Sequence, residues 1–150
     1  MLSQIHRVVN ISLALICFLF VGSFALQAEV VVGTLGHVRD GDTFAVCDAT
    51  KCTNIRLCGI DSPERNNAAS AAATAALKAI LRGQKIHCKI VGSGTVCDGR
   101  SQKTNRDRYV AQCAVNGVDV AGKLVDAGHA CDWLKFSNGH YSRGKSVCKK

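Results

Sequence analysis

Cysteine is the residue type that most constrains how this chain can fold. The sequence holds nine cysteines in 150 residues, and only one of them, Cys17, lies near the start. Without Cys17, eight cysteines remain. An even number of cysteines in a small exported domain predicts a framework of disulfides, so the fold must bring the members of each pair together. Structural zinc sites with paired C-x-x-C spacings are the alternative, and no cysteine pair here has that spacing. The remaining eight are Cys47, Cys52, Cys58, Cys88, Cys97, Cys113, Cys131 and Cys148.

The first 28 residues predict a route to an oxidising compartment. Arg7 precedes a long apolar run, and small residues follow it up to Ala28, which is the order of a secretory signal peptide. Cleavage after Ala25 and cleavage after Ala28 both fit, and we take Ala28. The alternative is an uncleaved membrane anchor, because the apolar run approaches the length that spans a bilayer. We therefore expect a signal peptide over 1–28, a single exported domain over 29–150, and a secreted or periplasmic location.

The expected exported domain is basic. Removing the signal segment takes away one of 19 basic residues and none of the 11 acidic ones, which leaves 18 against 11 and a net charge of +7. A basic surface favours a polyanionic partner, and nucleic acid, an anionic membrane face and an acidic polysaccharide all qualify. Such a surface can also serve solubility alone. No internal repeat or flexible linker divides the domain, so we expect one core.

The pattern of apolar, turn-forming and Ala-rich segments predicts the elements of the fold. The expected strands cover 30–38, 43–47, 55–60, 85–91 and 108–115, and the expected helices cover 66–82 and 118–127. Three strands, a helix, two strands and a second helix is the order of an α+β OB-fold, a five-stranded β-barrel with two or three helices. Cys47–Cys52 and Cys88–Cys113 would be neighbours in this order, although eight cysteines permit many pairings.

Two short motifs carry the residue types that hydrolytic chemistry requires. The first is Asp40-Gly-Asp-Thr43, which taken alone is more often only a hairpin turn. The second runs from Ile55 to Glu64 and reads I-R-L-C-G-I-D-S-P-E, an apolar strand that begins with an arginine and ends in an acidic corner. Pro63 restrains the corner and so helps to hold its two carboxylates. The corner also has the pattern of a helix start, and the two interpretations are compatible.

Together the motifs resemble the staphylococcal nuclease, or thermonuclease, family, whose pattern is a D-G-D-T turn followed by an R-L-x-G-I-D-x-P-E strand and corner. The resemblance continues through Arg108-Tyr-Val-Ala-Gln-Cys113 and covers most of residues 30–136. It implies a calcium-dependent nuclease that hydrolyses DNA, and RNA as well, to 3′-phosphate ends. It further implies a nucleic-acid substrate, a monomer and no stable protein partner, with a membrane contact only if the signal segment stays uncleaved.

The resemblance also implies a role for each acidic residue of the motifs. Asp42 and Asp61 would bind calcium through their carboxylates, and Ser62 would bind it through its backbone carbonyl. This set suits calcium, a hard cation that takes oxygen ligands in flexible geometry. Glu64 would handle the attacking water, either by deprotonating it or by orienting it. As a helix-capping carboxylate instead, Glu64 would matter for stability and not for activity.

Arg56 and Arg108 would hold the scissile phosphate by the same resemblance. The planar guanidinium suits this task better than lysine because it binds phosphate oxygens in pairs. The family pattern before the fifth strand is D-x-Y-G-R, whereas this chain reads Thr104-Asn-Arg-Asp-Arg108, so Arg106 and Arg100 compete with Arg108. We expect Arg56→Ala and Arg108→Ala each to lose nearly all turnover and to leave the fold intact.

Two other functions fit the same sequence. One is a non-catalytic OB-fold module that binds nucleic acid, and retention of all five charged positions argues against it. The other is a disulfide-rich extracellular interaction protein with no calcium affinity and no salt-dependent DNA binding. Four aromatic residues could stack on bases or fill the core, namely Tyr109, Trp133, Phe136 and Tyr141. Three histidines are expected in surface or packing roles, namely His87, His129 and His140.

Overall fold

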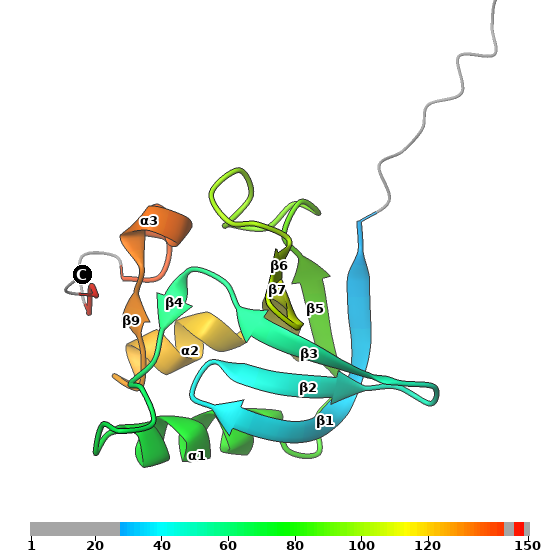
Figure 1. Ribbon diagram of the computed structural model, residues 1–150, viewed down its shortest axis with the longest axis horizontal. Helices are drawn as coiled ribbons and strands as arrows, with labels where there is room; N and C mark the ends of the chain where they lie inside the picture. Colours follow the sequence, from blue (N-terminus) through cyan, green and yellow to red (C-terminus); the bar gives the residue numbers. More distant parts are fainter. Residues whose placement is uncertain (1–27, 143–145, 149–150) are drawn as a thin grey trace, which may run out of the picture.

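Five strands form a closed barrel, which confirms the predicted α+β OB-fold (Figure 1). The computed structural model describes residues 28–142 and 146–148. Neighbouring strands pair antiparallel from β3 through β2, β1 and β5 to β7, and parallel pairing of β3 with β7 closes the barrel. The barrel strands are β1 (Val30–Asp40), β2 (Thr43–Cys47), β3 (Cys52–Leu57), β5 (Ile86–Ile90) and β7 (Arg108–Val115).

Three helices and four short strands complete the described part of the chain. The helices are α1 (Ser70–Leu81), α2 (Val120–Asp126) and α3 (Leu134–Ser137). The short strands are β4 (Ile60–Asp61), β6 (Thr104–Asn105), β8 (Val118–Asp119) and β9 (Cys131–Asp132). None of the helices in the described ranges is both long and apolar enough to cross a membrane. All but the last residue of the predicted signal peptide lie outside those ranges, so the signal peptide stays a prediction.

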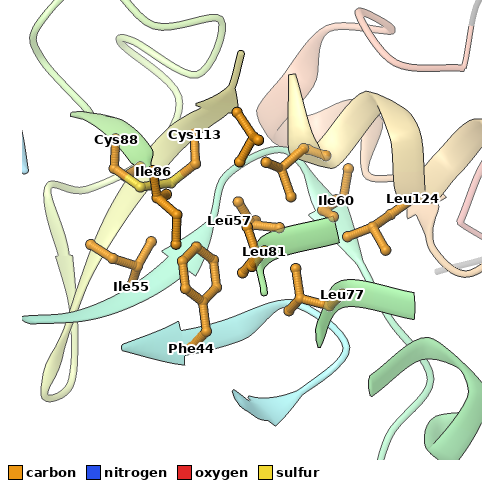
Figure 2. Close-up of a cluster of buried hydrophobic side chains, with 14 of the residues drawn as sticks. Phe44, Ile55, Leu57, Ile60, Leu77, Leu81, Ile86, Cys88, Cys113 and Leu124 are labelled. Carbon is orange, nitrogen blue, oxygen red and sulfur yellow. A yellow bond between two sulfur atoms is a disulfide. The ribbon is translucent and has the colours of Figure 1, made fainter. Parts of the chain in front are cut away.

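The barrel core explains why these segments form strands and helices. Phe44 of β2 and Ile55 and Leu57 of β3 point toward Leu77 and Leu81 of α1 (Figure 2), and all five are at most 1% exposed. Alternate residues of β5 are buried, which is the period of a strand with one face on the core. Truncation of one such leucine to alanine typically costs about 2–5 kcal/mol. The core therefore fixes the strands whose ends carry the motif residues.

The first helix begins later than the sequence pattern predicts. The backbone N–H of Asn67 donates to the Glu64 carbonyl at 2.8 Å, and the N–H of Ser70 donates to the Asn67 carbonyl at 3.0 Å. The Asn67 side chain accepts from the N–H of Ala69 at 2.9 Å. Asparagine side chains compete with helical hydrogen bonds in this way, so the segment forms turns and α1 starts only at Ser70. The predicted helix start at the acidic corner was wrong, and Glu64 does not cap α1.

The predicted strand over 55–60 is broken at Gly59. β3 ends at Leu57, and the chain resumes as β4, which pairs antiparallel with β9 outside the barrel (Figure 1). Gly59 has a φ of +74°, and a Cβ there would lie 2.9 Å from the ring of Tyr141. Only glycine tolerates both the left-handed conformation and this close approach. The break turns the acidic corner away from the barrel wall and toward β9.

Four disulfides join the eight cysteines of the domain. Cys47–Cys52 links the ends of β2 and β3, and Cys88–Cys113 links directly opposite residues of β5 and β7. Both pairs were predicted. The two other pairs were left open by the sequence: Cys58–Cys97 ties the loop after β5 to the end of β3, and Cys131–Cys148 ties the C-terminal segment to β9.

Candidate active site

The structure brings all six predicted site residues into one open cleft of about 710 Å³. The turn between β1 and β2 supplies the first carboxylate, β3 and β7 supply one arginine each, and β4 with the following corner supplies the rest. The six are Asp42, Arg56, Asp61, Ser62, Glu64 and Arg108. Residues from four places in the sequence therefore meet in one cleft.

Asp42 sits in a tight turn and is buried. Asp40 pairs with Thr43 across the hairpin, so Gly41 and Asp42 form the two-residue turn. One carboxylate oxygen of Asp42, Oδ2, accepts from the backbone N–H of Ser62 at 3.0 Å, and the other accepts from the Thr43 hydroxyl at 3.1 Å. A Cβ on Gly41 would lie 2.7 Å from the side chain of Ala73 in α1. The glycine therefore lets the hairpin approach α1 closely.

Burial makes the ionised form of Asp42 costly. The side chain of Asp42 is 8% exposed, and burial raises its pKa, an effect that the nearby Arg56 guanidinium partly offsets. Asp40, also in the cleft, raises the pKa of Asp42 further. Since an isolated charge in such a place is unfavourable, the carboxylate gains from any cation that enters the cleft.

Arg56 is the cation at the centre of the cleft. Its Nη2 atom lies 2.9 Å from the Asp42 carboxylate and 3.4 Å from the Asp61 carboxylate. The guanidinium also donates to the backbone carbonyls of Leu57 at 2.6 Å and Ile60 at 2.9 Å. With its side chain only 12% exposed, Arg56 is fixed by these contacts and bridges the hairpin turn and the acidic corner.

Arg108 lies on β7, the strand that pairs parallel with β3, and is half-buried. It donates to the Thr43 hydroxyl at 3.0 Å and to the Asn105 carbonyl at 3.4 Å. Burial lowers the pKa of Arg108, and repulsion from Arg56 and then Arg39 lowers it further. The Asp42 and Asp40 carboxylates offset these effects only in part, so an anionic ligand beside Arg108 would be favoured.

The structure distinguishes among the three arginines that the sequence left in competition. Arg108 alone of the three reaches the hydroxyl beside Asp42. Arg106 is exposed on the rim of the same cleft, whereas Arg100 is exposed and lines a neighbouring hollow. These positions support Arg108 as the second inner arginine and leave Arg106 at the entrance.

Three further basic or polar residues on the rim were not predicted. Arg39, Arg65 and Asn105 all line the cleft and are exposed. Arg65 donates to the Arg39 carbonyl at 3.3 Å, and the Arg39 guanidinium lies 3.7 Å from the Asp107 carboxylate. Arg39 directly precedes the D-G-D-T turn, so its place on the hairpin was the available signal.

The aromatic residues divide between the core and a second hollow of about 610 Å³ that adjoins the cleft. Trp133 lines both spaces, and Phe136 lines the second, where the two rings meet edge to face at 4.6 Å. Tyr141 is 5% exposed and fills the core. Tyr109 is exposed but lines neither space. The residues that line the two spaces include no histidine, which agrees with the ordinary roles expected for His87, His129 and His140.

The donor set around Asp42 and Asp61 suits a hard cation. An arginine nitrogen already lies within 3.4 Å of both carboxylates, so positive charge is favoured between them. Two carboxylates, a backbone carbonyl at Ser62 and water are ligands that calcium accepts in variable number. In the described part of the chain, the only three metal-binding side chains with donor atoms within 4.8 Å of one another are instead Asp61, Cys131 and Cys148. Calcium here would therefore depend on water and carbonyl ligands as well.

Comparison with known proteins identifies the family. The sequence profile of the family described as staphylococcal nuclease homologue matches residues 54–146, which hold every predicted site residue except Asp42. Two proteins named "Uncharacterized endonuclease", one from Escherichia coli O157:H7 and one from Escherichia coli, are each 32% identical over 120 residues. The aligned region covers 79% of this chain and 72% of each relative. The chain therefore belongs to the staphylococcal nuclease family and is a nuclease.

Proposed function

We propose that this nuclease is exported, requires calcium, and hydrolyses DNA and RNA to 3′-phosphate ends with little sequence preference. The observation that carries the proposal is the cleft in which Arg56 lies between the Asp42 and Asp61 carboxylates and Arg108 lines the same space. The relatives named as endonucleases support cleavage within a strand. The four disulfides support export to an oxidising compartment.

The two inner arginines would bind the scissile phosphate. Burial and then repulsion from Arg56 lower the pKa of Arg108, and a phosphodiester anion beside the two arginines would offset both effects. Negative charge increases on the phosphoryl oxygens during attack, so fixed guanidiniums stabilise the transition state more than the ground state. The contacts that hold Arg56 mean that little reorganisation is needed when charge develops.

Asp42, Asp61 and the Ser62 carbonyl would hold the calcium ion. When bound, calcium would polarise a phosphate oxygen and neutralise part of its charge. The buried Asp42 carboxylate, whose pKa is raised by burial, would gain a second compensating cation. The hydrogen bond from the Ser62 N–H to Asp42 ties two of these ligands together, so the corner and the hairpin turn would bind the ion as one unit.

Glu64 would act on the attacking water. It is exposed at the mouth of the cleft and lies outside α1, so its carboxylate is available to solvent. A carboxylate there can accept a proton from water or orient the water toward phosphorus. Both roles require Glu64 to be ionised and within hydrogen-bond reach of the water once substrate is bound.

The rim explains why sequence preference should be low. Arg39, Arg65 and Arg106 surround the cleft and would contact phosphates, which carry no base identity. Trp133 and Phe136 offer ring surfaces in the adjoining hollow, and stacking accepts any base. Binding through several arginines should also weaken steeply as salt is raised.

One assay tests the proposal against its alternatives. Oxidised protein is incubated with single-stranded DNA in calcium, with and without chelator, beside Glu64→Gln and the matched control Asp126→Asn, an exposed carboxylate on α2. We expect calcium-dependent cleavage by the native chain and the control, and loss of cleavage in Glu64→Gln. Binding without cleavage would favour the non-catalytic module. Neither binding nor cleavage would favour the interaction protein, and cleavage that persists in chelator would overturn the calcium requirement.

A further inference from the structure

The tail disulfide lies directly beside a residue of the cleft. Cys131 of β9 stands opposite Asp61 of β4 in the pairing of these two strands. The Sγ atom of Cys131 lies 3.4 Å from the Asp61 backbone oxygen. One carboxylate oxygen of Asp61 and the sulfurs of Cys131 and Cys148 all lie within 4.8 Å of one another, and the three residues are half-buried. Three possible metal ligands therefore surround one space at the edge of the cleft.

Backbone contacts hold Cys148 in this place independently of the disulfide. The N–H of Asp132 donates to the Ser146 carbonyl at 2.8 Å, and the N–H of Cys148 donates to the Asp132 carbonyl at 2.9 Å. Val147 forms a bridge with Asp132 between these two bonds. A single isolated bridge thus joins the tail to β9. Cleavage of the S–S bond would leave both sulfurs next to Asp61.

Exposure favours reduction of this disulfide over two of the others. Cys58, Cys97, Cys88 and Cys113 are each at most 1% exposed. The remaining two disulfides have partly or fully exposed members, and they are Cys47–Cys52 and Cys131–Cys148. A reductant in solution can therefore open the tail disulfide while the two disulfides inside the fold stay intact.

We propose that reduction of Cys131–Cys148 creates a zinc site formed by two thiolates and the Asp61 carboxylate. A dithiol reductant supplies two electrons and two protons, is itself oxidised to a disulfide, and leaves two thiols, whose protons are released when Zn²⁺ binds. Tetrahedral zinc with Zn–S bonds of about 2.3 Å needs sulfurs roughly 3.8 Å apart, and rotation of the two side chains from Cα atoms 5.0 Å apart can provide this. Thiolates select zinc over calcium.

The site would compete with calcium for Asp61. This consequence rests on the proposed function, because it requires Asp61 to be a calcium ligand. With Asp61 bound to zinc, the cleft would keep only one of its two calcium carboxylates. The nuclease would then be inhibited where thiols stay reduced and zinc is present, and active where the disulfide forms.

Cobalt binding tests the site without reference to nuclease activity. The variant Cys47→Ser/Cys52→Ser removes the other exposed disulfide. It is reduced with dithiothreitol, freed of reductant under oxygen-free conditions, checked for two free thiols, and titrated with Co²⁺, whose thiolate charge-transfer bands report the ligands. We expect one Co²⁺ per chain, displaced by Zn²⁺, and no bands before reduction. Asp61→Asn should weaken binding at least about tenfold, as even loss of an outer-shell partner does. The same titration of the reduced native chain, with Cys131→Ser/Cys148→Ser as the control that lacks both thiols, repeats the test without the substitutions at Cys47 and Cys52.

The outcomes separate this proposal from the proposed function. Two free thiols with no cobalt–thiolate band would overturn the zinc site, and so would an affinity unchanged by Asp61→Asn. Failure of the oxidised protein to cleave DNA in calcium would overturn the proposed function and leave the cobalt result unaffected. Zinc binding with undiminished calcium-dependent cleavage would overturn the competition for Asp61.

Discussion

Arg56→Ala should lower both activity and stability, whereas Arg108→Ala should lower activity alone. Arg56 is the counter-ion of Asp42, with side chains 12% and 8% exposed, so its removal leaves a buried carboxylate without a cation. Breaking a fully buried pair lowers the free energy of unfolding by about 3–5 kcal/mol. Because the cleft is open to solvent on one side, we expect a loss of about 3 kcal/mol for Arg56→Ala. Arg108 donates only to the neutral acceptors Thr43 Oγ1 and the Asn105 carbonyl, so its loss should cost no more than about 1 kcal/mol.

Urea unfolding of the oxidised protein in chelator at pH 7 measures this difference. In an Asp42→Asn background position 42 carries no charge that could be left unpaired, so the cost of Arg56→Ala should fall by at least about 1.5 kcal/mol. Arg82→Ala, an exposed arginine just after α1, is the matched control and should change stability by less than about 0.5 kcal/mol. Equal costs of Arg56→Ala in both backgrounds, or an Arg108→Ala cost as large as that of Arg56→Ala, would refute the counter-ion role.

Four further predictions follow from the same contacts. The pKa of Asp42 is raised in the folded protein. The stability that Asp42 contributes without metal is therefore complete below the ordinary carboxyl pKa of 3.8 and is lost as the pH rises through the raised pKa. Urea unfolding of the native chain and of Asp42→Asn from pH 3 to pH 7 measures this loss. Gly41→Ala should lower the free energy of unfolding by about 1–3 kcal/mol, measured by thermal unfolding, because the new Cβ would lie 2.7 Å from the Cβ of Ala73 in α1. Cys58→Ala/Cys97→Ala removes the disulfide that joins residues 39 positions apart. It should lower the free energy of unfolding by about 4 kcal/mol, measured by denaturant unfolding. Glu64→Gln should slow turnover at least about a hundredfold in steady-state assays, with stability within about 0.5 kcal/mol of the native chain.

The barrel and the inner site were predictable because both depend on local patterns. Alternating burial along Ile86–Ile90 and the apolar strand over Arg108–Val115 follow from period-2 hydrophobicity, and the structure has the second strand at the predicted bounds. The D-G-D-T turn and the R-L-C-G-I-D-S-P-E strand each place charged residues at strand ends. The family resemblance allowed Asp42, Arg56 and Asp61 to be grouped from the sequence. In the barrel Thr43 of β2 pairs with Arg56 of β3, and the chain after the break at Gly59 brings Asp61 within 3.4 Å of Arg56.

The features that escaped prediction depend on tertiary contacts. The late start of α1 comes from side-chain hydrogen bonds of Asn67 that helix propensity does not describe. The break at Gly59 is set by the ring of Tyr141, which is far away in sequence. The proximity of Cys131 to Asp61 arises from the pairing of β4 with β9, two short strands without a sequence signature.

Mass analysis of the cleavage products shows whether this nuclease needs calcium and on which end of the fragment it leaves the phosphate. A single-stranded DNA oligonucleotide is incubated with oxidised protein in calcium, and the fragments are weighed to locate the terminal phosphate. We expect fragments that end in a 3′-phosphate, produced by the native chain in calcium and absent in chelator and with Asp42→Asn. Fragments that persist in chelator or with Asp42→Asn, or that carry the phosphate on the 5′ end, would contradict it.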